Sequence, residues 1–309
     1  MADVVIAGAA GRMGCRLVAL LQEDKDLRLV AALEAPGHPA LLKDAGEIAG
    51  VGKLGVPITA DPEGALGRDR ILIEFSVPDA SLGHLRMTAR QGGRAVIGTT
   101  GFAAAQREEI ERLAREVPIL LSPNMSVGVN VAFRVLADMA RLLGDDYDVE
   151  ISEVHHRFKK DAPSGTAAKM AEVVAQALGR DLTKVGVYGR HGLPGERTRK
   201  EIGVHSLRSG DVVGDHTVSF GNLGERLELT HRAQNRDTYV RGALRAAKFI
   251  TQAKPGLYSM QDVWASRHEN RAVQGRRARR ATVSSTAPIS SSIPARPTAR
   301  SSEGASGGR

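Results

Sequence analysis

The chain has 309 residues, of which 42% are hydrophobic, a length and composition that exclude a fibrous or wholly disordered protein and allow two domains. Its single cysteine, Cys15, excludes an intramolecular disulfide and argues against a structural cysteine-zinc site. The N-terminus lacks a basic segment followed by a long apolar one, and no apolar run approaches ~18 residues. We therefore expect a cytoplasmic protein without a membrane partner.

The net charge of +8 raises the question of nucleic-acid binding, but most of this charge lies at one end of the chain. Residues 267–309 contain nine arginines and two glutamates, a balance of +7, and no aromatic residue. Such a composition buries too little apolar surface to offset the entropy lost on ordering. We therefore predict a disordered basic tail at 267–309. Binding of its Arg276–Arg280 run to RNA is the less favoured alternative to a solvated charge run.

The first structural unit predicted from the sequence is a strand, a glycine turn, a helix and a second strand. The apolar run Val4–Ala7 leads into Gly8–Gly14 and a helical pattern, and a second apolar run, Leu27–Leu33, ends at Glu34. In a dinucleotide-binding unit, glycines let the backbone approach a pyrophosphate and a terminal carboxylate binds ribose hydroxyls. The glycines at 8, 11 and 14 depart from the G-x-G-x-x-G spacing, so a purely structural glycine turn stays an alternative.

Strands and helices continue to alternate up to residue 121. Residues 35–69 contain many glycines and prolines, and we expect loops and short elements there. Beyond them, the sequence predicts strands at 71–75, 95–97 and 118–121, with helices at 78–90 and 104–115. This alternation favours an open parallel sheet, whose ligand lies at the carboxyl ends of the strands. The loops 8–14, 98–101 and 122–125 qualify, although any strand-to-helix connection needs similar residues.

The pattern changes after a linker near residues 124–130. A long apolar helix at 127–143 is followed by strands at 148–154, 217–220 and 226–231, without a helix between the last two. This order predicts a second, α+β domain with a mixed sheet. A helix from Thr238 and the segment Gly256–Trp264 complete the ordered chain. The predicted fold class is α/β, with a Rossmann-like nucleotide domain and an α+β substrate domain.

The stretch Glu153–Ala168 has the densest cluster of titratable and anion-binding groups in the sequence. Ser164 is expected to cap a helix, so that free N–H groups near Gly165 and Thr166, with the helix dipole, form a carboxylate or phosphate site. A lysine at 159 or 160 would complete this site, which predicts an anionic substrate.

Two adjacent histidines, His155 and His156, precede the lysines. On a strand they point in different directions, so we expect no metal site. A histidine near a lysine and a bound carboxylate can act as a general acid at neutral pH. The alternative is one structural histidine beside solvated lysines.

This stretch resembles the signature of the 4-hydroxy-tetrahydrodipicolinate reductase (dihydrodipicolinate reductase) family. Further segments resemble the family in the same order, over about Val4 to Val263: Gly8–Gly14, Gly98–Phe102, Ser126–Asn130, Gly214–Thr217 and Gly224–His231. The resemblance implies reduction of a cyclic, imine-bearing dicarboxylate by NADH or NADPH in diaminopimelate and lysine biosynthesis, by a homotetramer. It also implies a nucleotide domain at 1–126, a substrate-binding and tetramerisation domain at 127–236, and a segment at 237–266 that completes the nucleotide domain.

The resemblance also implies roles for individual residues. His155 would be the proton donor or acceptor and Lys159 the second catalytic cation, while His156, Gly165 and Thr166 would hold substrate carboxylates. The residues implied in cofactor binding are Gly8, Ala9, Ala10, Gly11, Arg12, Met13, Glu34, Gly98, Thr99, Thr100, Ser122, Pro123, Asn124 and Met125.

The residue after Glu34 bears on the choice of cofactor. Some family members have an arginine there to pair with the 2′-phosphate of NADPH, whereas this chain has Ala35. We therefore expect a preference for NADH, unless Arg12 or Lys43 reaches the phosphate.

Two other functions fit parts of the sequence. Another nicotinamide-dependent enzyme, such as a semialdehyde or homoserine dehydrogenase, would share the first glycine turn but not the stretch around His155. A non-catalytic dinucleotide sensor with a nucleic-acid-binding tail would bind NADH without turnover.

Overall fold

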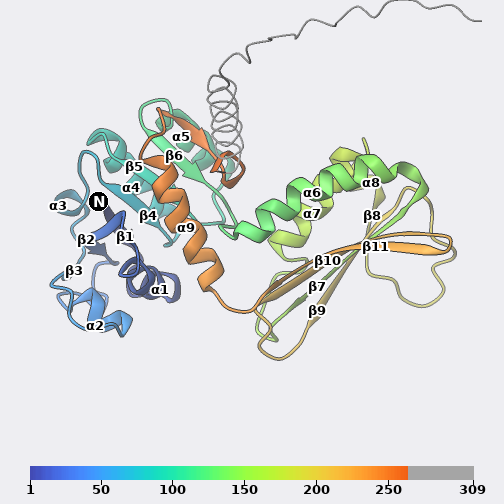
Figure 1. The fold of residues 1–309 in the computed structure, drawn as a ribbon, viewed down its shortest axis with the longest axis horizontal. Coiled ribbons are helices and arrows are strands. Elements are labelled where there is room, and N and C mark those ends of the chain that lie inside the picture. Colours follow the sequence, from blue (N-terminus) through green and yellow to red (C-terminus); the bar gives the residue numbers. More distant parts are fainter. Residues whose placement is uncertain (264–309) are drawn as a thin grey trace, which may run out of the picture. The chain divides into compact units, whose positions relative to one another are not determined.

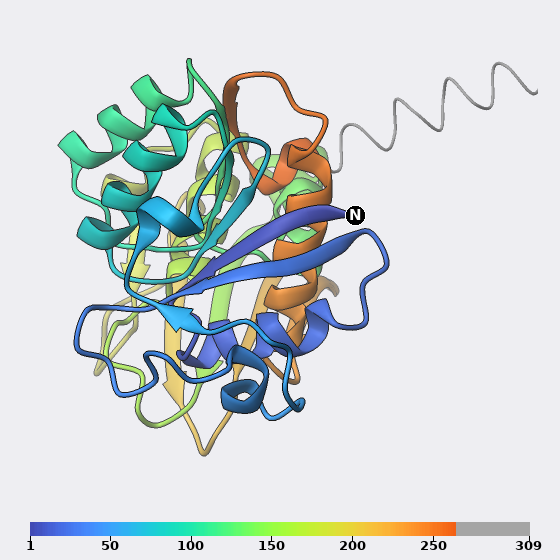
Figure 2. The same cartoon turned by 90° about the vertical axis from the view of Figure 1, so that its left-hand side faces the viewer.

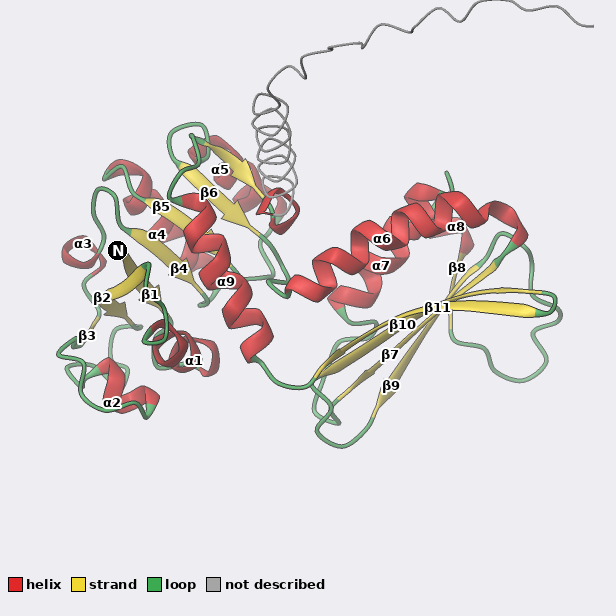
Figure 3. Ribbon diagram, viewed as in Figure 1, coloured by secondary structure: helices red, strands yellow, loops and turns green. Residues whose placement is uncertain are grey.

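The computed structural model describes residues 1–263, and the predicted disordered tail at 267–309 lies outside the described residues. The described part of the chain contains a seven-stranded sheet and a five-stranded sheet with their helices (Figures 1 and 3). This arrangement confirms the predicted combination of a parallel and a mixed sheet. No helix among residues 1–263 is both long and apolar enough to cross a membrane.

The seven-stranded sheet is parallel throughout, in the order β12-β6-β5-β4-β1-β2-β3. The chain leaves β1 toward β2 and β3 on one side, then returns to β4, β5 and β6 on the other. The point where the strand order reverses is where such sheets bind ligands. The strands are β1 (Ala2–Ala7), β2 (Leu27–Leu33), β3 (Ile58–Thr59), β4 (Ile71–Glu74), β5 (Arg94–Ile97), β6 (Pro118–Leu121) and β12 (Gly256–Tyr258).

Helices cover both faces of this sheet because successive strand residues point to opposite sides. In β1, Val4 and Ile6 pack with helices α1 (Arg12–Leu21) and α9 (Asp237–Ile250). Val5 and Ala7 pack with α4 (Pro78–Arg90) and α5 (Ala104–Leu113), which lie on the side of the sheet opposite α9 (Figure 2). Between β2 and β4 lie the short helices α2 (Ala45–Ala49) and α3 (Pro62–Ala65) and the two-residue strand β3, which agrees with the loops and short elements predicted there.

The five-stranded sheet is mixed, in the order β11-β10-β7-β9-β8. Its central strand β7 (Asp148–His155) is antiparallel to β10 (Gly214–Asn222) and parallel to β9 (Ile202–Arg208). The edge strands are β11 (Glu225–Ala233) and β8 (Gly186–Tyr188). The sequence analysis did not find β8 and β9, and it gave β10 as 217–220 only.

One face of the mixed sheet packs against α6 (Val127–Leu143) and α7 (Gly165–Ala177), with the shorter α8 (Leu182–Val185) following. Val149 and Ile151 of β7 are fully buried in this core. Because the side-chain period of a strand is two residues, Glu153 and His155 point to the same buried face. The strand therefore carries two titratable side chains into a largely apolar layer.

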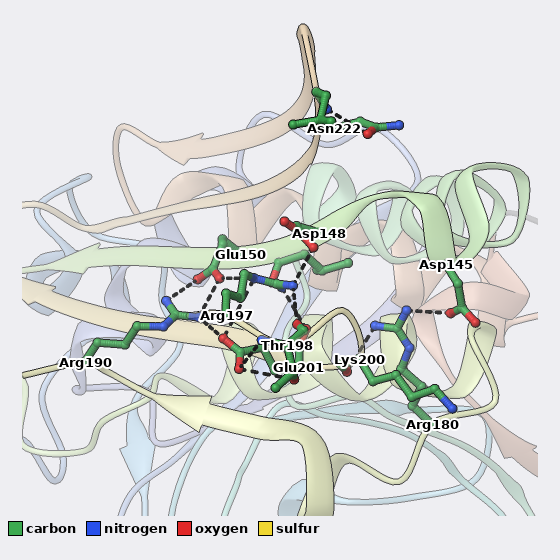
Figure 4. A network of polar contacts seen from close by, with 12 residues as sticks. Asp145, Asp148, Glu150, Arg180, Arg190, Arg197, Thr198, Lys200, Glu201 and Asn222 are labelled. Carbon is green, nitrogen blue, oxygen red and sulfur yellow. Dashed lines mark hydrogen bonds and ion pairs between the residues drawn. The ribbon is translucent and has the colours of Figure 1, made fainter. Parts of the chain in front are cut away.

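The other face of β7 carries acidic residues that bind the long connection between β8 and β9 (Figure 4). Glu150 accepts hydrogen bonds from Arg190 at 2.8 Å, Arg197 at 2.9 Å and His205 at 2.7 Å. Burial raises the pKa of Glu150, but hydrogen bonds from Arg190, His205 and Arg197 outweigh it and lower the pKa to about 2. This cluster fastens the connection to the sheet.

Candidate active site

The glycine turn after β1 brings the start of α1 close to the strand. Gly8 has φ +72°, and a Cβ at Gly14 would lie 2.1 Å from the Gly8 carbonyl oxygen and 2.6 Å from Ala9 Cα. Gly11 precedes α1 and provides no side-chain cap, so the first N–H groups of the helix have no partner in the turn. The N–H groups at the start of α1 are uncapped, and the glycines before them leave room for a ligand to approach the backbone. This arrangement fits the pyrophosphate of a dinucleotide.

Glu34 lies at the end of β2, beside this turn. Its carboxylate accepts hydrogen bonds from the backbone N–H of Ala10 at 3.0 Å and of Ala35 at 3.1 Å. The carboxylate is thereby fixed next to the residues expected to bind the pyrophosphate. The adenosine ribose, which is attached to the pyrophosphate, would lie beside this carboxylate. The residues fit the adenosine half of a dinucleotide.

A cavity of about 570 Å³ opens at the carboxyl ends of the parallel strands. Its walls include the start of α1, the loops after β5 and β6, the segment between β7 and α7, and the start of α7. From the predicted cofactor set it is lined by Met13, Gly98, Thr100, Ser122, Pro123, Asn124 and Met125, and from the predicted catalytic and substrate sets by His155, Lys159, Gly165 and Thr166. The structure thus brings two distant stretches of the sequence to one cavity.

The remaining predicted residues lie outside that lining. Gly8, Ala9, Ala10, Gly11, Arg12 and Glu34 belong to the glycine turn and its acidic partner, while Thr99 is buried within the loop after β5. His156 is half-buried, and its ring packs against Phe158 with centroids 6.3 Å apart. A contact between His156 and a substrate stays a prediction.

Asn124 connects the loop after β6 to the start of α7. Its side-chain N–H₂ donates to the Thr166 hydroxyl at 2.9 Å, and its side-chain oxygen accepts from the backbone N–H of Ser126 at 2.8 Å. Asn130 donates to the carbonyl of Asn124 at 2.8 Å. Asn124 therefore aligns a predicted cofactor loop with the predicted carboxylate site.

The start of α7 offers N–H groups to an anion. Ser164 caps the helix by accepting from the N–H of Ala167 at 3.2 Å, as predicted. Within residues 1–263, no hydrogen bond occupies the backbone N–H of Gly165 or Thr166, and a Cβ at Gly165 would meet no atom within 4 Å. These N–H groups and the helix dipole make this end of the cavity favourable for a carboxylate.

Two cationic or protonatable side chains line the cavity near this helix start. His155 is 9% exposed and its Nδ1 lies 2.5 Å from a carboxylate oxygen of Glu153. Lys159 contacts the carboxylate of Asp161 at 2.8 Å and 2.9 Å, and its ammonium lowers the pKa of Asp161. Of the two lysines left open by the sequence, Lys159 lines the cavity and Lys160 is exposed outside it.

Several residues around His155 were not assigned to the site from the sequence. Glu153 binds the histidine directly, Arg208 of β9 binds Glu153 at 3.0 Å, and His216 of β10 packs against His155 with ring centroids 5.1 Å apart. Glu153 could have been found, because it precedes His155 by two residues in a strand and so shares its face. His216 lies in Gly214–Thr217, one of the segments that resemble the family, but the sequence analysis assigned it no role. Strand pairing brings His216 and Arg208 to His155.

The chain matches known proteins over nearly all of its described length. Family models described as "Dihydrodipicolinate reductase, N-terminus" and "Dihydrodipicolinate reductase, C-terminus" match residues 2–125 and 128–264. The 4-hydroxy-tetrahydrodipicolinate reductase of Syntrophus aciditrophicus is 53% identical over 263 residues, which are 85% of this chain and 98% of the relative. The protein of the same name from Geobacter sulfurreducens is 51% identical over the same shares.

A solved structure extends the likeness to the fold. The dipicolinate-bound dihydrodipicolinate reductase of Paenisporosarcina sp. TG-14 has a TM-score of 0.65 and 25% identity, covering 84% of this chain and 97% of that protein. The sequence similarity, the fold and the residues that line the cavity all point to the same family. The chain belongs to the dihydrodipicolinate reductase family, oxidoreductases that use a nicotinamide dinucleotide to reduce 4-hydroxy-tetrahydrodipicolinate in diaminopimelate and lysine biosynthesis.

Proposed function

We propose that His155 transfers the proton and Lys159 supplies the second positive charge in the reduction of 4-hydroxy-tetrahydrodipicolinate by this chain. The observation that carries this proposal is a single cavity lined by His155, Lys159, the start of α7 and the loops after β5 and β6. Reduction adds a hydride and a proton, and loss of the 4-hydroxyl group releases water. A protonatable ring beside an anion site matches the proton half of this balance.

The start of α7 binds one carboxylate of the substrate through the N–H groups of Gly165 and Thr166. The Thr166 hydroxyl accepts from Asn124, which leaves its own hydrogen free to reach the same carboxylate. His156 is the proposed partner of the second carboxylate. The dipicolinate found in the relative from Paenisporosarcina is a small dicarboxylate, which supports this chemistry.

The nicotinamide dinucleotide, when bound, supplies the hydride. We propose that Gly8–Met13 and Glu34 hold its adenosine and pyrophosphate, and that the loops Gly98–Thr100 and Ser122–Met125 surround its nicotinamide. Ser122 lines the cavity, and Thr99 is buried in the loop after β5.

We propose a preference for NADH over NADPH. Ala35 follows Glu34 and offers neither charge nor side-chain donor to a 2′-phosphate, while Glu34 places a negative charge beside it. Measured kcat/KM should be higher with NADH, and Ala35→Arg should raise kcat/KM for NADPH. A clear NADPH preference of the unchanged chain would contradict the proposal.

A coupled assay that generates 4-hydroxy-tetrahydrodipicolinate and follows NADH absorbance tests the reaction. We expect NADH oxidation that depends on this substrate and none with aspartate semialdehyde. NADH oxidation with the semialdehyde instead would favour the alternative nicotinamide-dependent dehydrogenase. NADH binding without turnover on any of these compounds would favour the sensor.

The domain division, assembly and location are further proposals. We propose a nucleotide domain at 1–126, a substrate domain at 127–236 and a segment at 237–266 that completes the first, in a cytoplasmic homotetramer. The pairing of β12 with β6 supports the return of the chain to the first sheet. The family models end at residue 264. Removal of residues 267–309 should therefore leave kcat unchanged. The number of subunits per assembly, measured by light scattering, should also stay the same.

A further inference from the structure

Glu153 is a carboxylate with no exposed surface, two residues before His155 on β7. Burial of an unpaired charge is costly, so each of its oxygens needs partners. One oxygen accepts from the backbone N–H of Ser164 at 3.1 Å, the other meets His155 Nδ1 at 2.5 Å, and Arg208 donates to both at 3.1 Å and 3.0 Å. The carboxylate is therefore held in one orientation by three separate elements.

We propose that Glu153 is a positioning residue for the reaction, which holds His155 by its Nδ1–H so that Nε2 is the nitrogen that exchanges the proton with the substrate. The inference rests on the proposed role of His155. It assigns to the buried Glu153 the task of orienting the His155 ring.

The charge state of Glu153 agrees with this task. Burial raises the pKa of Glu153, but hydrogen bonds from His155, Ser206 and Arg208 outweigh it and leave the pKa below its ordinary value. An ionised carboxylate only accepts hydrogen bonds, so His155 must present Nδ1 as the donor. In the neutral ring this leaves Nε2 unprotonated, and in the cation it leaves Nε2–H as the proton to be given away.

Gly214 leaves space for the His155 ring on the side of Nε2 and Cδ2. A Cβ at Gly214 of β10 would lie 2.9 Å from Nε2 and 3.4 Å from Cδ2 of His155. Gly214 does not have a positive φ, so the backbone itself does not require glycine there. The missing side chain leaves room for the ring in the orientation that Glu153 selects.

His216 forms the third contact of the ring and stays neutral. Its ring meets His155 edge to face at 76°, and its Nε2 lies 2.9 Å from the Ser164 hydroxyl. Burial, together with the neighbouring His155, lowers the pKa of His216 to about 3. A proton gained by His155 is therefore not passed to His216.

The proton then has one route. It moves from Nε2 of protonated His155 to the substrate, which leaves a neutral ring with its hydrogen on Nδ1, and the ring regains a proton from water before the next turnover. The charged groups around the ring are Glu153 and Arg208 from the sheet and Lys159 and Asp161 from the loop before α7. Among them, Glu153 is the group in direct contact with the ring, at Nδ1.

Glu153→Gln tests the proposal because it keeps size and shape but replaces an acceptor by an amide that can donate to Nδ1. The ring would then carry its hydrogen on Nε2 when neutral, and its cation would lose its counter-charge. We expect kcat to fall about 10²–10⁴-fold, with the Kd for NADH unchanged. The pH profile of kcat should also differ from that of the unchanged protein, because the carboxylate beside the ring is replaced.

The matched control is Glu150→Gln, which removes a carboxylate from the opposite face of the same strand. It should leave kcat and the pH profile unchanged. If Glu153→Gln lowers folded yield instead, Gly214→Ala gives the second test, since its methyl group displaces the ring while Glu153 keeps its charge. We expect a fall in kcat there too.

The outcomes separate this inference from the role of His155 itself. Loss of kcat in His155→Gln together with an unchanged kcat and pH profile in Glu153→Gln would overturn the positioning role and leave the proposed function intact. Retained kcat in His155→Gln would overturn the proposed function. Unchanged kcat in Gly214→Ala would also count against the positioning role.

Discussion

The cofactor half and the proton half of the site use different groups of the protein: backbone N–H groups in the first and side chains in the second. The cofactor half, around Gly8–Gly14, depends on backbone N–H groups and on the absence of side chains, with Glu34 as its one acidic partner. The proton half, around His155, depends on the side chains around its ring: the buried Glu153 and His216, and the partly exposed Arg208, which binds Glu153. One half is a matter of steric space and the other a matter of charge and orientation.

This difference separates two kinds of failure. A methyl group added to the cofactor half should disturb packing and dinucleotide binding before it affects proton transfer. A conservative change in the proton half should preserve the fold and lower kcat. The predictions below test whether the two halves fail in these different ways, in order of the expected effect.

Of the three changes compared next, Lys159→Ala should lower activity most. Lys159 lines the cavity, whereas the adjacent Lys160 is exposed outside it. We expect kcat/KM to fall about 10²-fold or more for Lys159→Ala, because a charge beside the reacting substrate is worth most where water is excluded. Lys160→Ala is the matched control and should change kcat/KM less than about twofold. Equal losses would show that the cluster acts only through its total charge.

Gly14→Ala should damage the cofactor half by sterics alone. A Cβ there would lie 2.1 Å from the Gly8 carbonyl oxygen, so α1 must move away from the turn. We expect a loss of about 1–3 kcal/mol in the free energy of unfolding and weaker NADH binding, measured by denaturant unfolding and by fluorescence titration. Gly165→Ala, with open space at its Cβ, should leave the stability unchanged. A Gly14→Ala protein of normal stability would contradict the close approach.

Glu150→Gln should have a smaller effect, confined to stability and dependent on pH. The folded protein lowers the pKa of Glu150 from 4.5 to about 2. A carboxylate with a depressed pKa stabilises the fold above its unfolded pKa, and this contribution is lost as the pH falls toward its folded pKa. The unchanged protein should therefore exceed Glu150→Gln in Tm at pH 7, and the difference should shrink below about pH 4.5. A difference that grows in acid would contradict the assigned partners.

The sequence was most informative where a segment is regular and its neighbours in the chain decide its structure. The strands at 27–33 and 118–121 and the helix at 127–143 were predicted with the bounds that the structure has. Strand β9 was missed because Gly203 and His205 interrupt its apolar pattern, and β8 because it has only three residues. Their positions depend on pairing with β7, which no local pattern reveals.

The site shows the same limit. The stretch Glu153–Ala168 was predicted from the sequence to be the active site because its titratable and anion-binding residues are close together in the chain. The contacts of Arg208, Gly214 and His216 with that stretch come from strands paired on either side of β7. Gly214 and His216 lie in a segment that resembles the family, but register between distant strands is set by the whole core. The contacts of these residues with His155 were therefore beyond prediction from one sequence.

The most direct test of the account is kcat of His155→Gln with saturating NADH and 4-hydroxy-tetrahydrodipicolinate. Glutamine keeps the bulk and polarity of the side chain but cannot carry the proton. The account predicts a kcat about 10²–10⁴-fold below that of the unchanged protein, in a variant that still folds and binds NADH. A kcat within about twofold of the unchanged protein would contradict the assignment of proton transfer to this residue.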